Sequence, residues 1–215
     1  MADIVRVIRL IDKQVKGFTV PSVTLISKRN DPYQVLISCL LSLRTKDKTT
    51  IEASSRLFKV ADSPKDMVKL TRLCIQKLIY PVGFYRNKSQ VILGVSRKIL
   101  EDYGGRVPEE MDELLKLKGV GRKTANLVLG LGYDKPAICV DTHVHRISNR
   151  LGWVKTKAPE ETEEALRKIV PRHLWIDLNT TIVTFGQNLC FPVSPFCSRC
   201  SVFKYCKRAN VTRFR

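Results

Sequence analysis

The sequence predicts an all-α protein. Apolar residues recur at helical spacing along most of the 215 residues, and no convincing run of alternating strand residues interrupts them. Short glycine-containing turns separate the periodic segments. A chain of this length buries about 70% of the surface that its unfolded form would expose, so it needs no disulfide staples. We therefore expect one large helical domain or two small intertwined ones.

The predicted helices follow one another along the chain. Gly17 ends the first helix, and Asp31 with Pro32 opens the second, which runs to residue 41. The same periodicity predicts further helices over residues 49–58, 63–70, 73–79, 88–103, 108–117, 123–131, 142–151, 160–169 and 174–188. The first helix has one apolar face, which consists of Ile4, Val7, Ile8, Ile11 and Val15.

Helical periodicity stops near the C-terminus, where four of the seven cysteines gather at the spacing Cys-x6-Cys-x2-Cys-x5-Cys: Cys190, Cys197, Cys200 and Cys206. Four thiolates from one short loop can surround a single tetrahedral zinc ion or the four irons of a cubane, and the spacing leaves both open. Basic residues lie between the cysteines; they either offset thiolate charge or contact a phosphate backbone. The other cysteines, Cys39, Cys74 and Cys139, are predicted to be small buried hydrophobes.

The chain is strongly basic, with 38 lysines and arginines against 20 acidic residues and a net charge of +18. Such an imbalance favours nucleic acid as the partner. An anionic membrane surface is the rival, but no run of eighteen apolar residues is present to span a bilayer. The N-terminus lacks the apolar core of a signal peptide, so we expect an intracellular protein, in the cytoplasm or nucleoid if the source is prokaryotic.

A glycine turn between two predicted helices is typical of a helix-hairpin-helix. Glycines let the backbone adopt positive φ, and the amides at the start of the second helix can bind a phosphate. The motif is moderately specific, because it also occurs in proteins that do no chemistry. The predicted phosphate contacts are Lys118, Gly119, Val120, Gly121 and Arg122.

Lys123 and Asp141 are the candidate catalytic pair. Lys123 lies in the first turn of the helix after the hairpin, where the helix dipole disfavours a cation and favours the neutral amine that nucleophilic attack requires. Another phosphate-binding lysine is the competing interpretation. Asp141 is placed to cap the helix over residues 142–151, and it could also face a pocket as a carboxylate.

Taken together, these residues resemble the endonuclease III family of helix-hairpin-helix DNA glycosylases. The resemblance covers essentially the whole chain and rests on residues 41–47, 83–88, 119–126 and 140–143 and on the cysteine spacing. It implies a [4Fe–4S] cluster on the four cysteines. It also implies two lobes with DNA between them: a six-helix barrel over residues 24–134, and a cluster domain built from residues 1–23 and 135–215.

By the resemblance, a damaged nucleotide in double-stranded DNA is flipped out of the stack. Lys123 then expels an oxidised pyrimidine, forms a Schiff base with the sugar, and nicks the strand by β-elimination. Asp141 stabilises the positive charge on the sugar. Substrates would be damaged pyrimidines or abasic sites, and we expect a monomer.

Two further positions match residues that the family inserts into the gap left by the flipped base. Phe84 is either a wedge or a core aromatic. Arg44 departs from the family's usual glutamine but can still donate hydrogen bonds to the orphaned base, so its preference among opposite bases is open. Lys118 replaces the usual proline and adds a cation near the phosphate. His143 is expected to contact DNA rather than to act as an acid or base.

Two alternatives remain. A mismatch-directed, monofunctional glycosylase of the same superfamily commonly lacks the lysine, so Lys123 argues against it. A non-catalytic DNA-binding module would need the hairpin, the charge and the cysteines but neither Lys123 nor Asp141. The agreement of several independent motifs favours the active glycosylase and lyase.

Overall fold

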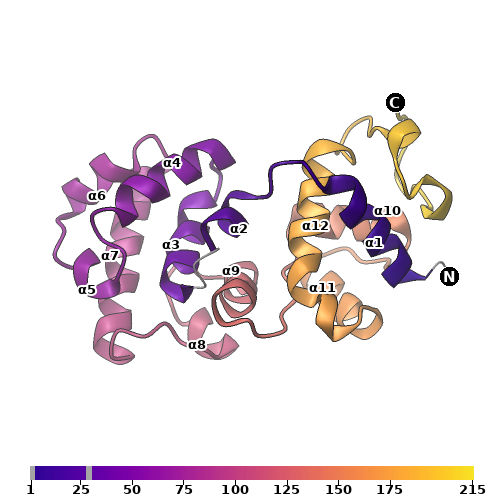
Figure 1. Ribbon diagram of the computed structural model, residues 1–215. Helices are drawn as coiled ribbons and strands as arrows, with labels where there is room; N and C mark the ends of the chain where they lie inside the picture. Colours follow the sequence, from indigo (N-terminus) through magenta and orange to yellow (C-terminus); the bar gives the residue numbers. More distant parts are fainter. Residues whose placement is uncertain (1–2, 28–30) are drawn as a thin grey trace. The chain divides into compact units, whose positions relative to one another are not determined.

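A computed structural model describes residues 3–27 and 31–215 (Figure 1). Every regular element in these residues is helical, which confirms the all-α prediction. No helix in the described part of the chain is long and apolar enough to cross a membrane.

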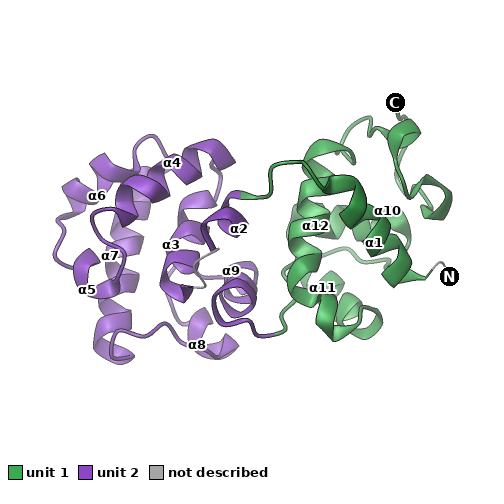
Figure 2. Cartoon of the chain, in the orientation of Figure 1, with its two compact units in different colours: residues 1–21, 136–215 green, residues 22–135 purple. Residues whose placement is uncertain are grey.

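The chain divides into two compact units, each described by itself (Figure 2). Unit 1 joins the residues up to Pro21 to Pro136–Arg215, and unit 2 comprises Ser22–Lys135. The sequence-based proposal divides the chain at residues 23/24 and 134/135. Unit 1 therefore contains both the N-terminal helix and the cysteine loop.

Unit 2 is built around α3 (Pro32–Ser42), which is buried on nearly all sides because its residues are apolar in every direction. Asp31 caps it by accepting hydrogen bonds from the backbone N–H groups of Tyr33 and Gln34. α2, α4, α7, α9 and η2 all contact α3. The other elements of the unit are α2 (Ser22–Ile26), α4 (Asp47–Phe58), α5 (Pro64–Met67), α6 (Arg72–Ile79), α7 (Tyr85–Asp102), α8 (Met111–Leu115), α9 (Arg122–Leu127) and the π-helical η2 (Val128–Gly132).

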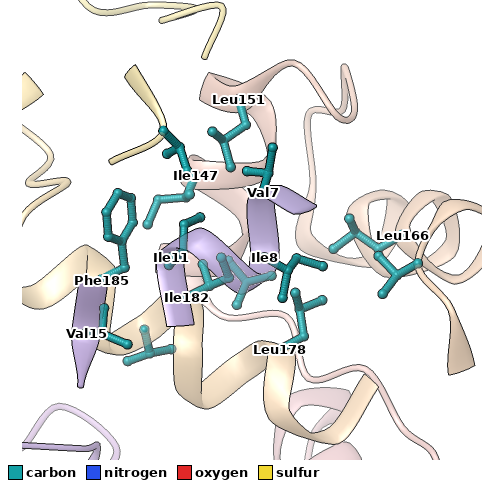
Figure 3. Packing of buried hydrophobic residues seen from close by; sticks show 14 of the residues in the cluster. Val7, Ile8, Ile11, Val15, Ile147, Leu151, Leu166, Leu178, Ile182 and Phe185 are labelled. Carbon is teal, nitrogen blue, oxygen red and sulfur yellow. The ribbon is translucent and has the colours of Figure 1, made fainter. Parts of the chain in front are cut away.

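Unit 1 packs α1 (Ile4–Val15) and α10 (Thr142–Leu151) against α12 (Trp175–Asn188). Its core contains the predicted face of α1, with Ile4 only partly buried, and side chains from α10 and α12 interleave with it (Figure 3). α11 (Pro159–Ile169) and the 3₁₀ turn η3 (Arg172–Leu174) complete the helical part. Two further 3₁₀ turns, η4 (Cys197–Arg199) and η5 (Phe203–Tyr205), lie in the cysteine loop.

Several predicted helices are shorter in the structure. The helix predicted over residues 63–70 is α5 (Pro64–Met67), and the one over residues 108–117 is α8 (Met111–Leu115). Residues 108–110 are not helical; Tyr133 donates to the carbonyl of Val107 and Lys135 donates to that of Glu109 at 2.9 Å. These bonds come from distant residues, so local periodicity cannot reveal them.

The helix predicted over residues 123–131 changes to π geometry after Leu127. Gly132 packs directly on α3, where an added Cβ would lie 2.8 Å from Pro32 Cα. The five-residue α2 was not predicted, because it is too short to show a period.

Candidate active site

The predicted hairpin connects α8 and α9 in unit 2. The backbone N–H of Val120 donates to the carbonyl of Leu117 at 3.1 Å and closes the turn. Gly119 has φ +80°, a conformation that favours glycine. Gly121 caps α9, and an added Cβ there would have no neighbour within 4 Å, so space is open beside the helix start. The Val120 side chain is buried, which leaves its backbone for any ligand contact.

Lys123 lies in the first turn of α9 with its residue exposed, and Arg122 and Lys118 are exposed beside it. The next residues along the helix, from Thr124 to Leu127, are buried. Burial raises the pKa of the Cys39 thiol in α3 to about 12, and the positive charge of Lys123 opposes that rise. Lys123 is therefore accessible at the start of a helix whose following residues pack into the unit.

Asp141 begins α10 in unit 1. Its Oδ1 atom accepts hydrogen bonds from the backbone N–H groups of His143 at 2.9 Å and Val144 at 2.8 Å, which confirms the predicted cap. The three residues before it, Ile138 to Val140, are buried, and Asn179 holds this segment by donating to the carbonyl of Cys139 at 3.1 Å. Asp141 itself is half-buried. Lys123 and Asp141 thus belong to different units, and each is anchored by its own unit.

His143 is half-buried against α12. A Cβ added at Gly186 would lie 2.5 Å from its Nδ1 atom, so only a glycine lets α12 approach so closely. Nη2 of Arg146 lies 3.2 Å from the same nitrogen, and it donates to the carbonyl of Cys190 at 2.8 Å. These contacts tie the start of α10 to the cysteine loop.

Arg44 and Phe84 lie on neighbouring loops of unit 2. Both have left-handed backbone conformations, with φ +52° and +59° respectively. The Arg44 guanidinium lies 5.8 Å from the centre of the Phe84 ring. Phe84 is 63% exposed, so the interpretation of this residue as a core aromatic is wrong.

The four C-terminal cysteines line one pocket in unit 1. Arg150, a buried residue of α10, reaches their loop: its Nη1 donates to the carbonyl of Phe191 at 2.6 Å and lies 3.5 Å from Cys190 Sγ. The backbone N–H of Arg208 donates to Cys206 Sγ at 3.3 Å. Burial raises the pKa of the Cys200 thiol to about 11, and it also raises the pKa of Cys197 and Cys206. A bound cationic group would oppose this effect and favour the thiolates.

Basic side chains of the loop also stack on its aromatic rings. The guanidinium of Arg215 lies 3.9 Å from the centre of the Phe196 ring, and that of Arg208 lies 4.5 Å from the centre of Phe203. These contacts pack the loop against itself. Neither this packing nor the contact of Arg150 with the loop was predicted from the sequence. The prediction of buried cysteines holds for Cys39 and Cys139, but Cys74 is only partly buried because it lies on the outer side of α6.

A helix-hairpin-helix unit and a four-cysteine loop on an all-helical scaffold are typical of the helix-hairpin-helix class of DNA repair proteins. The family model for the HhH-GPD superfamily of base excision DNA repair proteins matches residues 37–172. Endonuclease III of Thermotoga maritima is 52% identical over 180 residues, covering 84% of each chain. Endonuclease III homolog 1, chloroplastic, of Arabidopsis thaliana is 43% identical over 82% of this chain, which spans about half (49%) of that relative.

A solved structure of a trapped endonuclease III–DNA covalent intermediate superposes with a TM-score of 0.85 at 32% identity, covering 95% of this chain and 94% of that one. The chain belongs to the endonuclease III family of the HhH-GPD superfamily, which confirms the resemblance drawn from its motifs.

Proposed function

We propose that the protein is a bifunctional DNA glycosylase and abasic-site lyase of base excision repair that removes oxidised pyrimidines from double-stranded DNA. The observation that carries the proposal is Lys123, an exposed lysine in the first turn after the hairpin of an endonuclease III family member. A trapped covalent intermediate with DNA has been solved for a relative of matching fold. A covalent intermediate requires a nucleophile on the protein, and an amine is suited to attack on a sugar carbon.

Lys123 would act as the nucleophile on a nucleotide flipped out of the stack. Its neutral amine attacks the anomeric carbon, the carbon–nitrogen bond to the damaged base breaks, and the base leaves with the bonding electron pair and takes up a proton. Loss of a proton from the amine and opening of the sugar ring yield a Schiff base. Removal of a proton from the adjacent sugar carbon then expels the 3′ phosphate by β-elimination.

Asp141 would stabilise the positive charge that grows on the sugar as the base departs. The backbone N–H groups of His143 and Val144 hold its carboxylate through Oδ1, which restricts the rotation of the side chain. A carboxylate held in this way is pre-oriented, so little reorganisation is needed when the charge forms.

The hairpin and the basic surface would bind the DNA backbone. Lys118 and Arg122 are exposed beside Gly119 and Gly121, whose turn leaves space at the start of α9. The net charge of +18 favours a polyanionic partner. Arg44 and Phe84 are exposed and stacked, which suits insertion beside a flipped nucleotide. We also assign His143 a phosphate contact, which its half-buried position permits.

Cys190, Cys197, Cys200 and Cys206 would hold a [4Fe–4S] cluster. All four line one pocket, and four cysteine thiolates are the donor set of a [4Fe–4S] cubane. Hydrogen bonds from Arg150 and from the Arg208 backbone support the sulfurs. The cluster would supply iron–thiolate bonds that hold the loop.

Reductive trapping tests the proposal. The protein is incubated with a duplex containing thymine glycol in the presence of borohydride, which reduces a Schiff base to a stable amine. A covalent protein–DNA adduct and a nicked strand are the expected products. Base release without an adduct would assign the protein to the monofunctional glycosylases, and binding without base release would make it a DNA-binding module.

A further inference from the structure

Two residues of unit 2 that are not glycine have left-handed backbone conformations and lie on neighbouring loops. Arg44 lies between α3 and α4, and Phe84 lies immediately before α7. The two loops are in backbone contact at Gly83, where an added Cβ would lie 2.6 Å from the carbonyl oxygen of Arg44. A left-handed conformation is unfavourable for arginine and phenylalanine, so surrounding contacts must maintain it. Such conformations cluster at active sites and ligand-binding sites.

Lys88 supplies those contacts from the first turn of α7. The residue is only 8% exposed. Its ammonium group donates to the carbonyl of Leu41 at 2.8 Å, to the carbonyl of Leu43 at 2.5 Å and to Thr45 Oγ1 at 3.1 Å. A lysine has three donors, so these bonds use all of them. Leu41 and Leu43 lie at the end of α3, where a cation is favoured by the helix dipole.

Thr45 connects Lys88 to the second loop. Its hydroxyl oxygen accepts from the Lys88 ammonium and also from the backbone N–H of Gly83 at 3.2 Å. Hydrogen bonds therefore hold the residues around Arg44: Leu43 before it, Thr45 after it, and Gly83 on the opposite loop. The Arg44 guanidinium lies over the Phe84 ring.

We propose that Lys88 is a positioning residue that fixes the turn at Arg44 and so determines how strongly the protein discriminates among bases opposite the lesion. The inference rests on the proposed function. Removing the ammonium group would leave the Leu41 and Leu43 carbonyls without this donor and would free the turn at Arg44. The Arg44 side chain would then sample other directions, and its hydrogen bonds to the opposite base would lose their selectivity.

Binding to a stable abasic-site analogue tests this without requiring any chemistry. The dissociation constant is measured on duplexes with each of the four bases opposite a tetrahydrofuran site, for the full chain and for Lys88→Met, Arg44→Ala and the double variant. We expect Lys88→Met to reduce the ratio of the dissociation constants of the most weakly and most tightly bound duplexes about 5- to 10-fold, as a lost base contact would. Arg44→Ala should do the same, and the double variant should add nothing further, because both changes act through one side chain.

Lys98→Met provides the matched control, since Lys98 lies on the same helix and pairs with Asp102 at 2.6 Å. It should leave the ratio unchanged. If Lys88→Met does not fold, as judged by thermal melting, Thr45→Val removes the shared oxygen and should lower the ratio in the same direction. The proposal would be overturned if Lys88→Met weakened binding to all four duplexes equally, or if its effect added to that of Arg44→Ala. It would also be overturned if the unmodified protein bound all four duplexes equally well. Discrimination without excision of thymine glycol would instead refute the proposed chemistry and leave the role of Lys88 standing.

Discussion

Asp141 Oδ1 lies 2.8 Å from the backbone nitrogen of Val144, so a proposed catalytic carboxylate also caps α10. The two roles place different demands on the side chain. A cap needs only a hydrogen-bond acceptor, whereas stabilising a sugar cation needs a negative charge. Substitutions at this one position can therefore separate structure from chemistry.

Asp141→Asn should keep the cap and lose the charge. We expect the free energy of unfolding to change by no more than a few tenths of a kcal/mol, because asparagine and aspartate cap helices about equally well. Single-turnover excision of thymine glycol should fall about 10²- to 10³-fold. Asp141→Ala should lose the cap as well and cost about 1 kcal/mol in urea unfolding.

Thr71→Ala is the control for that comparison. Thr71 caps α6 by accepting from the backbone N–H of Cys74, so its loss should lower stability to a similar extent without slowing excision. Full activity in Asp141→Asn would leave this residue with a capping role alone.

Lys123→Gln should abolish the covalent step. Glutamine has no nucleophilic amine, so borohydride trapping and strand nicking should fall at least about 10³-fold, while the dissociation constant for abasic-analogue DNA changes less than about threefold. Lys116→Gln is the matched control, because Lys116 lies on the same hairpin and pairs with Glu113 at 2.6 Å. Trapping that survives in Lys123→Gln would point to a different nucleophile.

Salt dependence should report the phosphate contacts of the hairpin. Each phosphate that a cation neutralises contributes about −0.9 to the slope of log K against log salt concentration. Lys118→Ala should therefore make the slope less steep by about 1 and weaken binding to all sequences alike. The slope is measured by fluorescence anisotropy over a series of salt concentrations. A slope near zero for the unmodified protein would rule out phosphate docking.

Metal analysis should distinguish the two ligands that the cysteine spacing allows. A [4Fe–4S] cluster requires about four irons and four acid-labile sulfides per chain, whereas a structural zinc site requires one zinc and no sulfide. Cys206→Ser should lower the iron content and the visible absorbance and reduce the thermal melting temperature, because bound metal stabilises the folded loop. Stoichiometric zinc in the protein as isolated would contradict the cluster assignment.

Local signals predicted the parts of the fold that depend on neighbouring residues. α10 begins after Asp141, which caps it, and ends at Leu151 before Gly152, which has φ +77°, so local residues mark both ends of this helix. α1 matches its prediction for the same reason: its buried residues Val7, Ile8, Ile11 and Val15 recur at helical spacing. Lys123 and Asp141 were proposed from motifs, which are also local.

Contacts between distant residues could not be predicted in this way. Lys88 begins the helix predicted over residues 88–103, and nothing local indicates its partners, which lie 43 to 47 residues earlier in the chain. Arg150 likewise reaches the cysteine loop 40 to 42 residues later. Both are long cations that satisfy backbone carbonyls, and only the folded chain brings those carbonyls to them.

The burial of Lys88 should also produce a characteristic dependence of stability on pH. Burial lowers the pKa of Lys88 from 10.5 to about 8. Between these values the unfolded chain binds the proton and the folded chain does not, so the contribution of this group to stability rises with pH across that window. Its contribution is greatest above pH 10.5 and is lost as the pH falls through 8. The full change corresponds to roughly 3 kcal/mol.

The buried thiol of Cys39 lowers the stability of the folded chain as the pH rises. Its raised pKa keeps it protonated in the folded chain, whereas the unfolded thiol ionises around pH 9. The Lys88 effect is therefore measured as a difference: urea unfolding of the unmodified protein and of Lys88→Met at intervals from pH 7 to 10. The gap between the two free energies should be constant up to pH 8 and should then shift in favour of the unmodified protein. Lys98→Met should follow the unmodified protein closely up to pH 9. A gap that stays constant throughout would mean that Lys88 keeps its proton in the folded state, held by its three oxygen acceptors.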